Sequence, residues 1–182
     1  MPSFKSGEAE FHYWWVQQNR FLAGQTPVGY ESYNSKQYLS HLLDLGMRTF
    51  ISLQEEDEVS RKPFAFYHDA LERLSDDKGV ETSFVRVPAM DGSTLNDRQL
   101  TLLLDMIDAS LQRNAPVYLH CMAGHGRTGT VVGCWLARHG LTGAEALAKI
   151  TALRADDPHF GTRPSPQKPR QIAKVKSWKP AK

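Results

Sequence analysis

A cysteine and an arginine stand six positions apart, at Cys121 and Arg127, with a glycine-rich loop between them. Residues 117–120, just before the loop, alternate apolar and polar side chains in the pattern of a short strand. The pattern after the loop predicts a helix over residues 128–139. We therefore expect Cys121 at the end of a strand and Arg127 at the start of a helix.

This arrangement favours the binding of an anion. A tight turn between a strand and a helix directs several backbone N–H groups at one point, and the unpaired N–H groups of the helix start add positive potential there. Such a ring suits a phosphoryl group, and the planar guanidinium of Arg127 can bind two phosphate oxygens at once. Positive φ angles at the two loop glycines would let the loop curl. The residues expected to form this phosphate-binding loop are Met122, Ala123, Gly124, His125, Gly126 and Arg127.

Cys121 is expected on the floor of the same ring, where it could act as a nucleophile. The field that attracts a phosphate also stabilises a thiolate, which would lie beneath the phosphorus for in-line attack. The Thr128 hydroxyl could donate to the sulfur and stabilise it as a leaving group in a second step. His120 is expected to orient the loop through a backbone hydrogen bond rather than to act as a base, since a thiolate needs none.

The sequence His120-Cys121-x5-Arg127-Thr128-Gly129 resembles the signature of the cysteine-based protein tyrosine and dual-specificity phosphatases, in a bacterial-type or atypical form. Residues 20–27 are similar to the entry strand of bacterial members. The resemblance implies hydrolysis of phosphate monoesters through a cysteinyl-phosphate intermediate, with no cofactor and no metal. The alternative is a buried strand cysteine followed by a glycine turn. The Gly-Lys-Ser/Thr of a nucleotide-binding loop is absent from the sequence, as are the local motifs of cysteine proteases.

A proton donor for the leaving oxygen is expected at Asp91, because an alkoxide or phenoxide leaves poorly. Asp91 lies thirty residues before Cys121, in a segment of turn-forming residues that follows a predicted strand. In the resembled family the general acid is an aspartate at about this place, most often in Trp-Pro-Asp, where this chain has Ala89-Met90-Asp91. Asp91 could instead only cap a turn. Asp97 is the second candidate acid, although with Asn96 it fits the N-terminal cap of the next helix.

Two further polar regions could contribute to the site or could be ordinary solvent-exposed surface. In the resembled family a glutamine near the last helix can position the hydrolytic water, and Gln171 is the better candidate here, with Gln167 the weaker; both could be surface residues. The acidic segment 54–58 is either a solvated turn or a segment near the pocket that helps to position Arg127.

Cys134 and the C-terminal tail are also open to two interpretations. Cys134, inside the predicted helix after the loop, is expected to be a buried apolar residue, and the alternative is a resolving thiol that protects Cys121. The tail over residues 168–182 is basic and contains no acidic residue. It is either a solvated end or a weak contact site for an acidic partner.

The composition indicates one ordinary globular domain. With 182 residues, 41% of them hydrophobic, we expect a single phosphatase domain over residues 1–182, with loose termini at about 1–10 and 179–182. A net charge of +2 is too small to indicate a nucleic-acid partner. No apolar run approaches the roughly 20 residues of a membrane helix, so no integral membrane segment is expected. Two cysteines make no disulfide framework, which favours a reducing, cytoplasmic location.

Helical and strand patterns alternate along the chain, which predicts an α/β fold. We expect a central mixed sheet of four to five strands flanked by helices on both faces, as the resemblance to dual-specificity phosphatases also implies. The predicted strands are 11–16, 20–24, 48–53, 82–87 and 117–120, and the predicted helices are 35–45, 63–75, 100–112, 128–139, 142–154 and 167–178.

The sequence leaves the substrate open. The resemblance favours proteins phosphorylated on tyrosine, serine or threonine, and the alternatives are a phosphoinositide or another small phosphorylated molecule. Inositide phosphatases often have lysines inside the loop, where this chain has Met122, Ala123 and His125. His125 could still carry a charge in mildly acidic conditions. A protein that binds phosphate without hydrolysing it is the alternative from another functional class.

Overall fold

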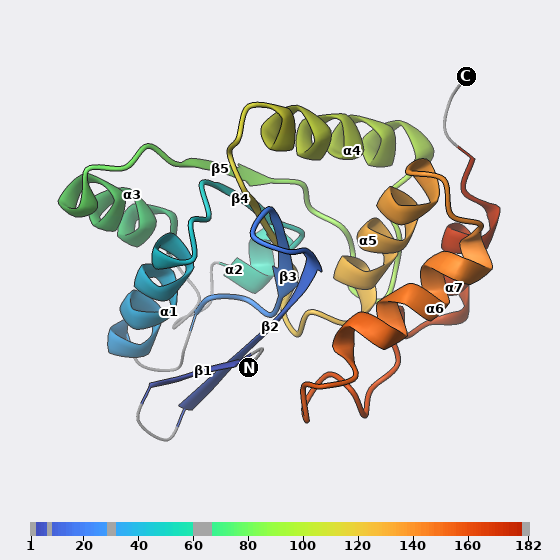
Figure 1. The fold of residues 1–182 in the computed structure, drawn as a ribbon, viewed down its shortest axis with the longest axis horizontal. Helices are drawn as coiled ribbons and strands as arrows, with labels where there is room; N and C mark the ends of the chain where they lie inside the picture. The colour runs from blue at the N-terminus through green and yellow to red at the C-terminus, as the bar shows by residue number, and fades with distance from the viewer. Residues whose placement is uncertain (1–2, 7–8, 29–31, 60–66, 180–182) are drawn as a thin grey trace.

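A computed structural model describes residues 3–6, 9–28, 32–59 and 67–179. Within these ranges it contains six strands and seven helices (Figure 1). In chain order they are β1 (Ser3–Ser6), β2 (Ala9–Gln17), β3 (Phe21–Gly24), α1 (Ser32–Asp44), β4 (Thr49–Ser52), α2 (Glu56–Val59), α3 (Tyr67–Lys78), β5 (Ser83–Arg86), α4 (Asp97–Gln112), β6 (Val117–His120), α5 (Gly126–Arg138), α6 (Gly143–Arg154) and α7 (Pro169–Ser177).

The strands form one mixed sheet in the order β1-β2-β3-β6-β4-β5. β1, β2 and β3 are joined by antiparallel pairing, whereas β3, β6, β4 and β5 are parallel to one another. The last residues of these four parallel strands are in register, with Gly24 beside His120, His120 beside Ser52, and Ser52 beside Arg86. The loops that follow them therefore meet at one edge of the sheet, which is where ligands bind in open α/β folds.

Alternate side chains of each strand enter different hydrophobic cores, because successive residues of a strand point to opposite faces. In β6, Tyr118 packs in the core beneath α1 and α3, whereas Val117 and Leu119 pack in the core beneath α4, α5, α6 and α7. Figure 1 shows the two groups of helices on opposite sides of the sheet. The predicted α/β fold, a mixed sheet with helices on both faces, is confirmed, and β1 extends the five strands β2 to β6 by a sixth strand at the edge.

Two helices begin at capping boxes. The Asn96 side chain accepts a hydrogen bond from the Gln99 N–H at 2.9 Å, and the Gln99 side chain accepts one from the Asn96 N–H at 3.2 Å. Thr142 and Glu145 form the same arrangement at the start of α6. Because Asn96 caps α4, the helix predicted from residue 100 begins at Asp97.

The structure differs from the sequence-based expectations in three segments. Residues 3–6, expected within a loose terminus, form β1 and pair with residues 9–12 of β2. The acidic segment 54–58, expected as a loop, contains the short helix α2. The start of the helix predicted over 63–75 lies outside the described residues, and α3 continues to Lys78. Among the described helices, none is both long enough and apolar enough to cross a membrane.

Candidate active site

The phosphate-binding loop turns sharply at Gly124, directly above the end of β3. Gly124 has φ of +73°, and a Cβ atom there would lie 2.5 Å from the carbonyl carbon of Gly24. Only glycine satisfies both conditions without strain. Gly126 is required for another reason than the positive φ we expected: it is the first residue of α5, its φ is not positive, and a Cβ there would lie 2.9 Å from Gln171 Oε1.

The unpaired backbone N–H groups of the loop indicate a site for an anion. His125, the N-cap residue of α5, makes no side-chain capping hydrogen bond. Among the described residues, the backbone N–H groups of residues 122–128 have no hydrogen-bond acceptor, whereas the carbonyl of Met122 accepts from the Thr26 N–H at 2.9 Å and fixes the outer side of the loop. Unpaired N–H groups at a helix start are suited to bind an anion.

Arg127 is held by groups that follow the neighbouring parallel strands. Its Nη1 donates to Glu58 Oε2 at 2.5 Å and its Nη2 donates to Glu58 Oε1 at 2.7 Å. Nη1 also lies 2.9 Å from the Ala89 carbonyl oxygen and 3.3 Å from that of Leu53. The acidic segment after β4 therefore positions Arg127 through Glu58, which is the second of the two interpretations that the sequence left open.

The guanidinium of Arg127 is buried and keeps one donor without a partner. Burial opposes its charge, but the hydrogen bond to Glu58 and the electrostatic interactions with Cys121, Glu58 and Asp91 more than compensate and raise the pKa of Arg127. Its Nε atom is buried and has no hydrogen-bond partner among the described residues. Because a buried donor without a partner costs free energy, a hydrogen bond from Nε to an acceptor atom of a ligand would be favourable.

Asp91 lies at the opening of the site. Its Oδ1 atom is 3.3 Å from Arg127 Nη2, and its side chain is 85% exposed where that of Arg127 is 2% exposed. The next residue is fixed to α7, because Arg170 Nε donates to the Gly92 carbonyl oxygen at 2.6 Å. The structure therefore brings Asp91 to Arg127, whereas Asp97, the other candidate acid, is paired with Lys174 Nζ at 2.7 Å.

Gln171 links three parts of the site. Its Oε1 accepts hydrogen bonds from the backbone N–H groups of Lys168 at 3.1 Å and Gln167 at 3.3 Å, and its Nε2 donates to the Ser93 carbonyl oxygen at 3.0 Å. It is completely buried and packs on Gly126, whereas Gln167 is exposed. These contacts join α7 to the Asp91 loop and to the start of α5. The water-positioning role of Gln171 stays a prediction.

His120 lies within hydrogen-bond distance of the Cys121 backbone. Its Nδ1 lies 3.1 Å from the Cys121 carbonyl oxygen, which can only accept, so Nδ1 carries the proton. The neutral ring then accepts at Nε2 from the Tyr67 hydroxyl at 2.8 Å. Burial lowers the pKa of His120 to about 4, a backbone hydrogen bond to Cys121 opposes this, and the charge of Arg127 adds to it. His120 is therefore neutral near pH 7.

His125 belongs to the loop, but its ring packs on the 156–166 segment. Nδ1 accepts a hydrogen bond from Arg154 Nη2 at 2.5 Å, and the ring centroid lies 5.4 Å from that of His159 and 5.1 Å from that of Phe160. Burial, and then the charge of Arg154, lower the pKa of His125 to about 3. The expectation that His125 could carry a charge in mildly acidic conditions is wrong, because a buried cation already lies against it.

The three remaining candidate side chains are buried. Cys121 is 3% exposed at the end of β6, and both it and Cys134 are free thiols. The Thr128 hydroxyl is buried and has no partner among the described residues. Cys134 lies in α5, where burial raises its pKa to about 12. This supports a protonated, apolar role for Cys134 rather than that of a resolving thiol.

The site thus contains a cysteine that precedes a loop with unpaired N–H groups, an arginine six residues later and an aspartate 3.3 Å from that arginine, which are features of the Cys-x5-Arg class of proteins. A family model described as "PTP-SAK: Swiss Army Knife protein, DSP-PTPase phosphatase domain" matches residues 11–174. The chain belongs to this family, within the cysteine-based tyrosine and dual-specificity phosphatase superfamily.

Individual relatives agree with this assignment. "Putative tyrosine phosphatase 067L" of Invertebrate iridescent virus 3 is 31% identical over 125 residues, which cover 66% of this chain and 46% of that protein. "Dual specificity protein phosphatase CDC14B" of Mus musculus is 27% identical over 148 residues, which cover 77% of this chain and 27% of that protein. The chain thus spans less than half the length of the curated relatives it matches.

Solved structures show the same fold. The "Tk-PTP in the active form" structure has a TM-score of 0.67 and 24% identity, with 90% of this chain and 93% of that chain covered. "PTPMT1 in complex with PI(5)P" has a TM-score of 0.68 and 21% identity, with 91% of this chain and 93% of that chain covered. At these identities the likeness concerns the fold.

Proposed function

We propose that this protein is a phosphatase that hydrolyses phosphate monoesters through a cysteinyl-phosphate intermediate on Cys121. The observation that carries the proposal is the set of buried or loop donors without partners around this cysteine, namely the N–H groups of residues 122–128 and Arg127 Nε. Donors in this arrangement match the equatorial oxygens of a phosphoryl group, and they stabilise charge that develops in the transition state.

In the first step the Cys121 thiolate attacks phosphorus, so that a sulfur–phosphorus bond forms while the bond from phosphorus to the leaving oxygen breaks. Asp91 gives a proton to that oxygen, which leaves as an alcohol or a phenol. In support of this role, the Asp91 side chain is 85% exposed and its Oδ1 lies 3.3 Å from Arg127 Nη2. Arg127 and the loop N–H groups hold the phosphoryl oxygens throughout.

In the second step a water molecule attacks the phosphocysteine. Asp91 takes a proton from the water, the sulfur–phosphorus bond breaks and inorganic phosphate is released. The sulfur leaves as a thiolate, and the unpaired hydroxyl of Thr128 is the group that we assign to stabilise it. The first role that we assign to Gln171 is to fix the Asp91 loop through its hydrogen bond to the Ser93 carbonyl oxygen. Its second proposed role is to position the water molecule through the other N–H of its amide.

The preferred substrate class is a protein phosphorylated on tyrosine, serine or threonine. Met90, directly before Asp91, is 64% exposed and offers an apolar surface beside the proposed acid, where an aromatic leaving group could pack. The two curated relatives described above are named as tyrosine and dual-specificity phosphatases. A phosphoinositide or another small phosphate ester is the alternative, favoured by the fold shared with a structure that holds PI(5)P.

The test is turnover of phenyl phosphate without added metal by the wild type, Cys121→Ser and Asp97→Asn. We expect the serine variant to lose at least a thousandfold in kcat, because a hydroxyl lacks the nucleophilicity of a thiolate. Asp97→Asn changes an exposed carboxylate of α4 and should retain wild-type turnover. Equal, background-level release of phosphate by wild type and Cys121→Ser, together with retained phosphate binding, would identify a non-catalytic binding protein.

A further inference from the structure

Two basic side chains lie against the residue that follows Asp91. Arg170 Nε donates to the Gly92 carbonyl oxygen at 2.6 Å. A Cβ atom built on Gly92 would lie 3.7 Å from Arg170 Nη2 and 3.7 Å from Lys168 Cε. Since Asp91 is itself 3.3 Å from Arg127 Nη2, these two cations stand beside the opening of the phosphate site.

The charges of Lys168 and Arg170 are not compensated. Both side chains are exposed, and in the described part of the chain neither of them forms an ion pair. Lys174, one turn further along α7, differs, because it is paired with Asp97 at 2.7 Å. No acidic residue occurs in residues 167–182. The start of α7 therefore presents two cations that are free to bind a carboxylate or a phosphate.

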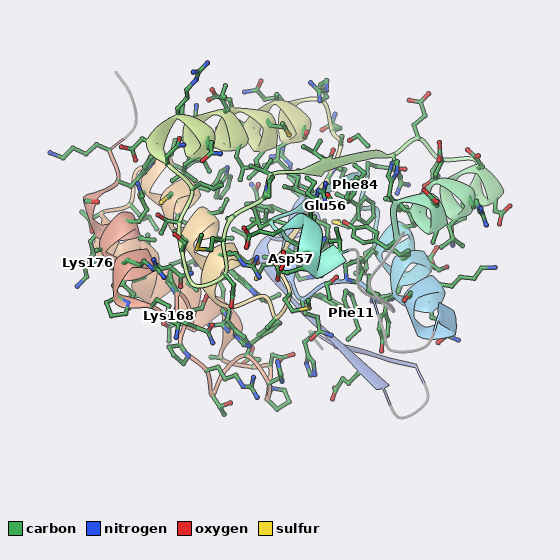
Figure 2. All side chains as sticks on the ribbon, turned by 180° about the vertical axis from the view of Figure 1, so that it is seen from behind. Phe11, Glu56, Asp57, Phe84, Lys168 and Lys176 are labelled. Carbon is green, nitrogen blue, oxygen red and sulfur yellow. The ribbon has the colours of Figure 1, made fainter. Side chains whose placement is uncertain are left out.

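The opposite side of the site contains acidic residues that differ from these two cations, because two of them are in ion pairs. The helix α2 follows β4 and contains Glu56, Asp57 and Glu58, the last of which binds Arg127. Figure 2 shows Glu56 and Asp57 on α2, separated across the molecule from Lys168 at the start of α7. Glu56 is paired with Arg86 and Glu58 with Arg127, so the attraction of a second anionic group on a bound phosphate ester is assigned to Lys168 and Arg170.

We propose that Lys168 and Arg170 form a second-anion subsite, and that the preferred substrates carry a second phosphate or a carboxylate a few bonds from the scissile phosphate. This inference rests on the proposed function and specifies its substrate class. The scissile phosphate occupies the loop above Cys121, the leaving oxygen faces Asp91, and the second anion lies over Gly92. The same chemistry can come from a soluble bisphosphate or from the headgroup of a lipid.

A matched pair of aryl phosphates tests the subsite. Phenyl phosphate and 3-carboxyphenyl phosphate share a similar leaving group, so the ratio of their kcat/KM values, carboxylated over plain, reports the second anion. We expect this ratio to exceed one for the wild type, to fall about twofold to fivefold in Lys168→Gln, and to fall further in Lys168→Gln/Arg170→Gln. Raising the ionic strength should lower the wild-type ratio, since the subsite is exposed.

Lys176→Gln is the matched control. Lys176 is an exposed lysine of the same helix, but its Cα packs against the start of α6 at Gly143, and in Figure 2 it lies farther from α2 than Lys168. Lys176→Gln removes the same net charge as Lys168→Gln. If the kcat/KM ratio of the two aryl phosphates stays at the wild-type value in Lys176→Gln, the subsite is local. An equal fall in Lys176→Gln and Lys168→Gln would reduce the effect to net charge and overturn the proposal, as would an unchanged ratio in the double variant.

The source of the second anion is resolved by presenting an inositol bisphosphate free in solution and, as its diacyl lipid, in phosphatidylcholine vesicles. A fall caused by Lys168→Gln with the free headgroup identifies a soluble substrate class, and a fall confined to vesicles identifies the lipid. Failure of the proposed function is distinguishable, because the wild type would then not hydrolyse phenyl phosphate at all. Turnover of phenyl phosphate with a ratio of one would refute only the subsite.

Discussion

Glu58 binds Arg127 through two parallel hydrogen bonds, with Nη1 2.5 Å from Oε2 and Nη2 2.7 Å from Oε1. The side chains are 17% and 2% exposed, so solvent screens this ion pair little. Both Nη atoms of Arg127 are thereby directed toward α2, and Nε is left without a partner. The orientation of the phosphate-binding guanidinium thus depends on a carboxylate 69 positions earlier in the chain.

Replacing Glu58 should weaken catalysis, although we do not expect Glu58 to contact the substrate. In Glu58→Gln the side chain keeps its shape but loses its charge and one acceptor, which costs Arg127 a charge-assisted hydrogen bond of about 1.5–3 kcal/mol. We expect kcat/KM for phenyl phosphate to fall roughly tenfold to a hundredfold. The matched control is Glu56→Gln, in the same helix, where the exposed carboxylate pairs with Arg86 on the surface. Equal activity of the two variants would contradict the role of Glu58.

Pre-steady-state kinetics can separate the two roles of Gln171. If it mainly holds the Asp91 loop through Ser93, Gln171→Ala slows protonation of the leaving group, and phosphoenzyme formation becomes slow. We expect slow phosphoenzyme formation in Gln171→Ala, with no rapid initial release of the phenol product. If it mainly positions water, the second step slows instead, and a burst with accumulated phosphoenzyme appears. Quenched-flow measurement with an aryl phosphate distinguishes the two outcomes.

Stability should depend on pH through two buried histidines. Their folded-state pKa values of about 4 for His120 and about 3 for His125 lie below the ordinary 6.5. Between about pH 6.5 and 4 the unfolded chain therefore binds more protons than the folded one, so the free energy of unfolding falls as pH is lowered through this window. Urea denaturation at several pH values measures this. His120→Asn should give a shallower slope, and a slope as steep as that of the wild type would contradict the assignment.

Two of the positive-φ glycines, Gly124 and Gly46, offer a direct test of loop packing. Gly124→Ala should destabilise the fold strongly and abolish phosphate binding, because the new Cβ would lie 2.5 Å from the Gly24 carbonyl carbon. Gly46→Ala shares the positive φ, at +88°, but has no atom within 4 Å of the new Cβ. It should cost only about 1 kcal/mol of backbone strain and keep activity. Thermal melts and phosphate titration compare the two variants, and similar losses in both would contradict a packing effect at Gly124.

Local patterns were enough to predict most of the sheet and the phosphate-binding loop. The alternation in residues 117–120, the glycines and the signature all lie within one short stretch, so a strand, a turn and a helix start follow from it. Asp91 could be proposed from its segment after a predicted strand and from the family resemblance, and the parallel strands that end at one edge bring it to Arg127.

Features that depend on distant packing were harder to predict. Nothing in the acidic segment distinguishes Glu58 from its neighbours until α2 places it over Arg127. The orientation of His125 depends on Arg154, which α6 brings behind the loop. The resemblance implies that Gln171 positions the hydrolytic water, yet its hydrogen bonds go to backbone groups of α7 and of the Asp91 loop. β1 could not be predicted from residues 3–6, because it exists through pairing with the edge of β2.

The most direct test of the account is to identify the covalent intermediate. The wild-type protein is mixed with an aryl phosphate, quenched within milliseconds and digested, and the phosphorylated peptide is sequenced by mass spectrometry. We predict one phosphoryl group on the sulfur of Cys121, formed at a rate that supports turnover and absent from Cys121→Ser. Turnover that proceeds with no phosphate on the protein, or with phosphate on another residue, would contradict the central claim.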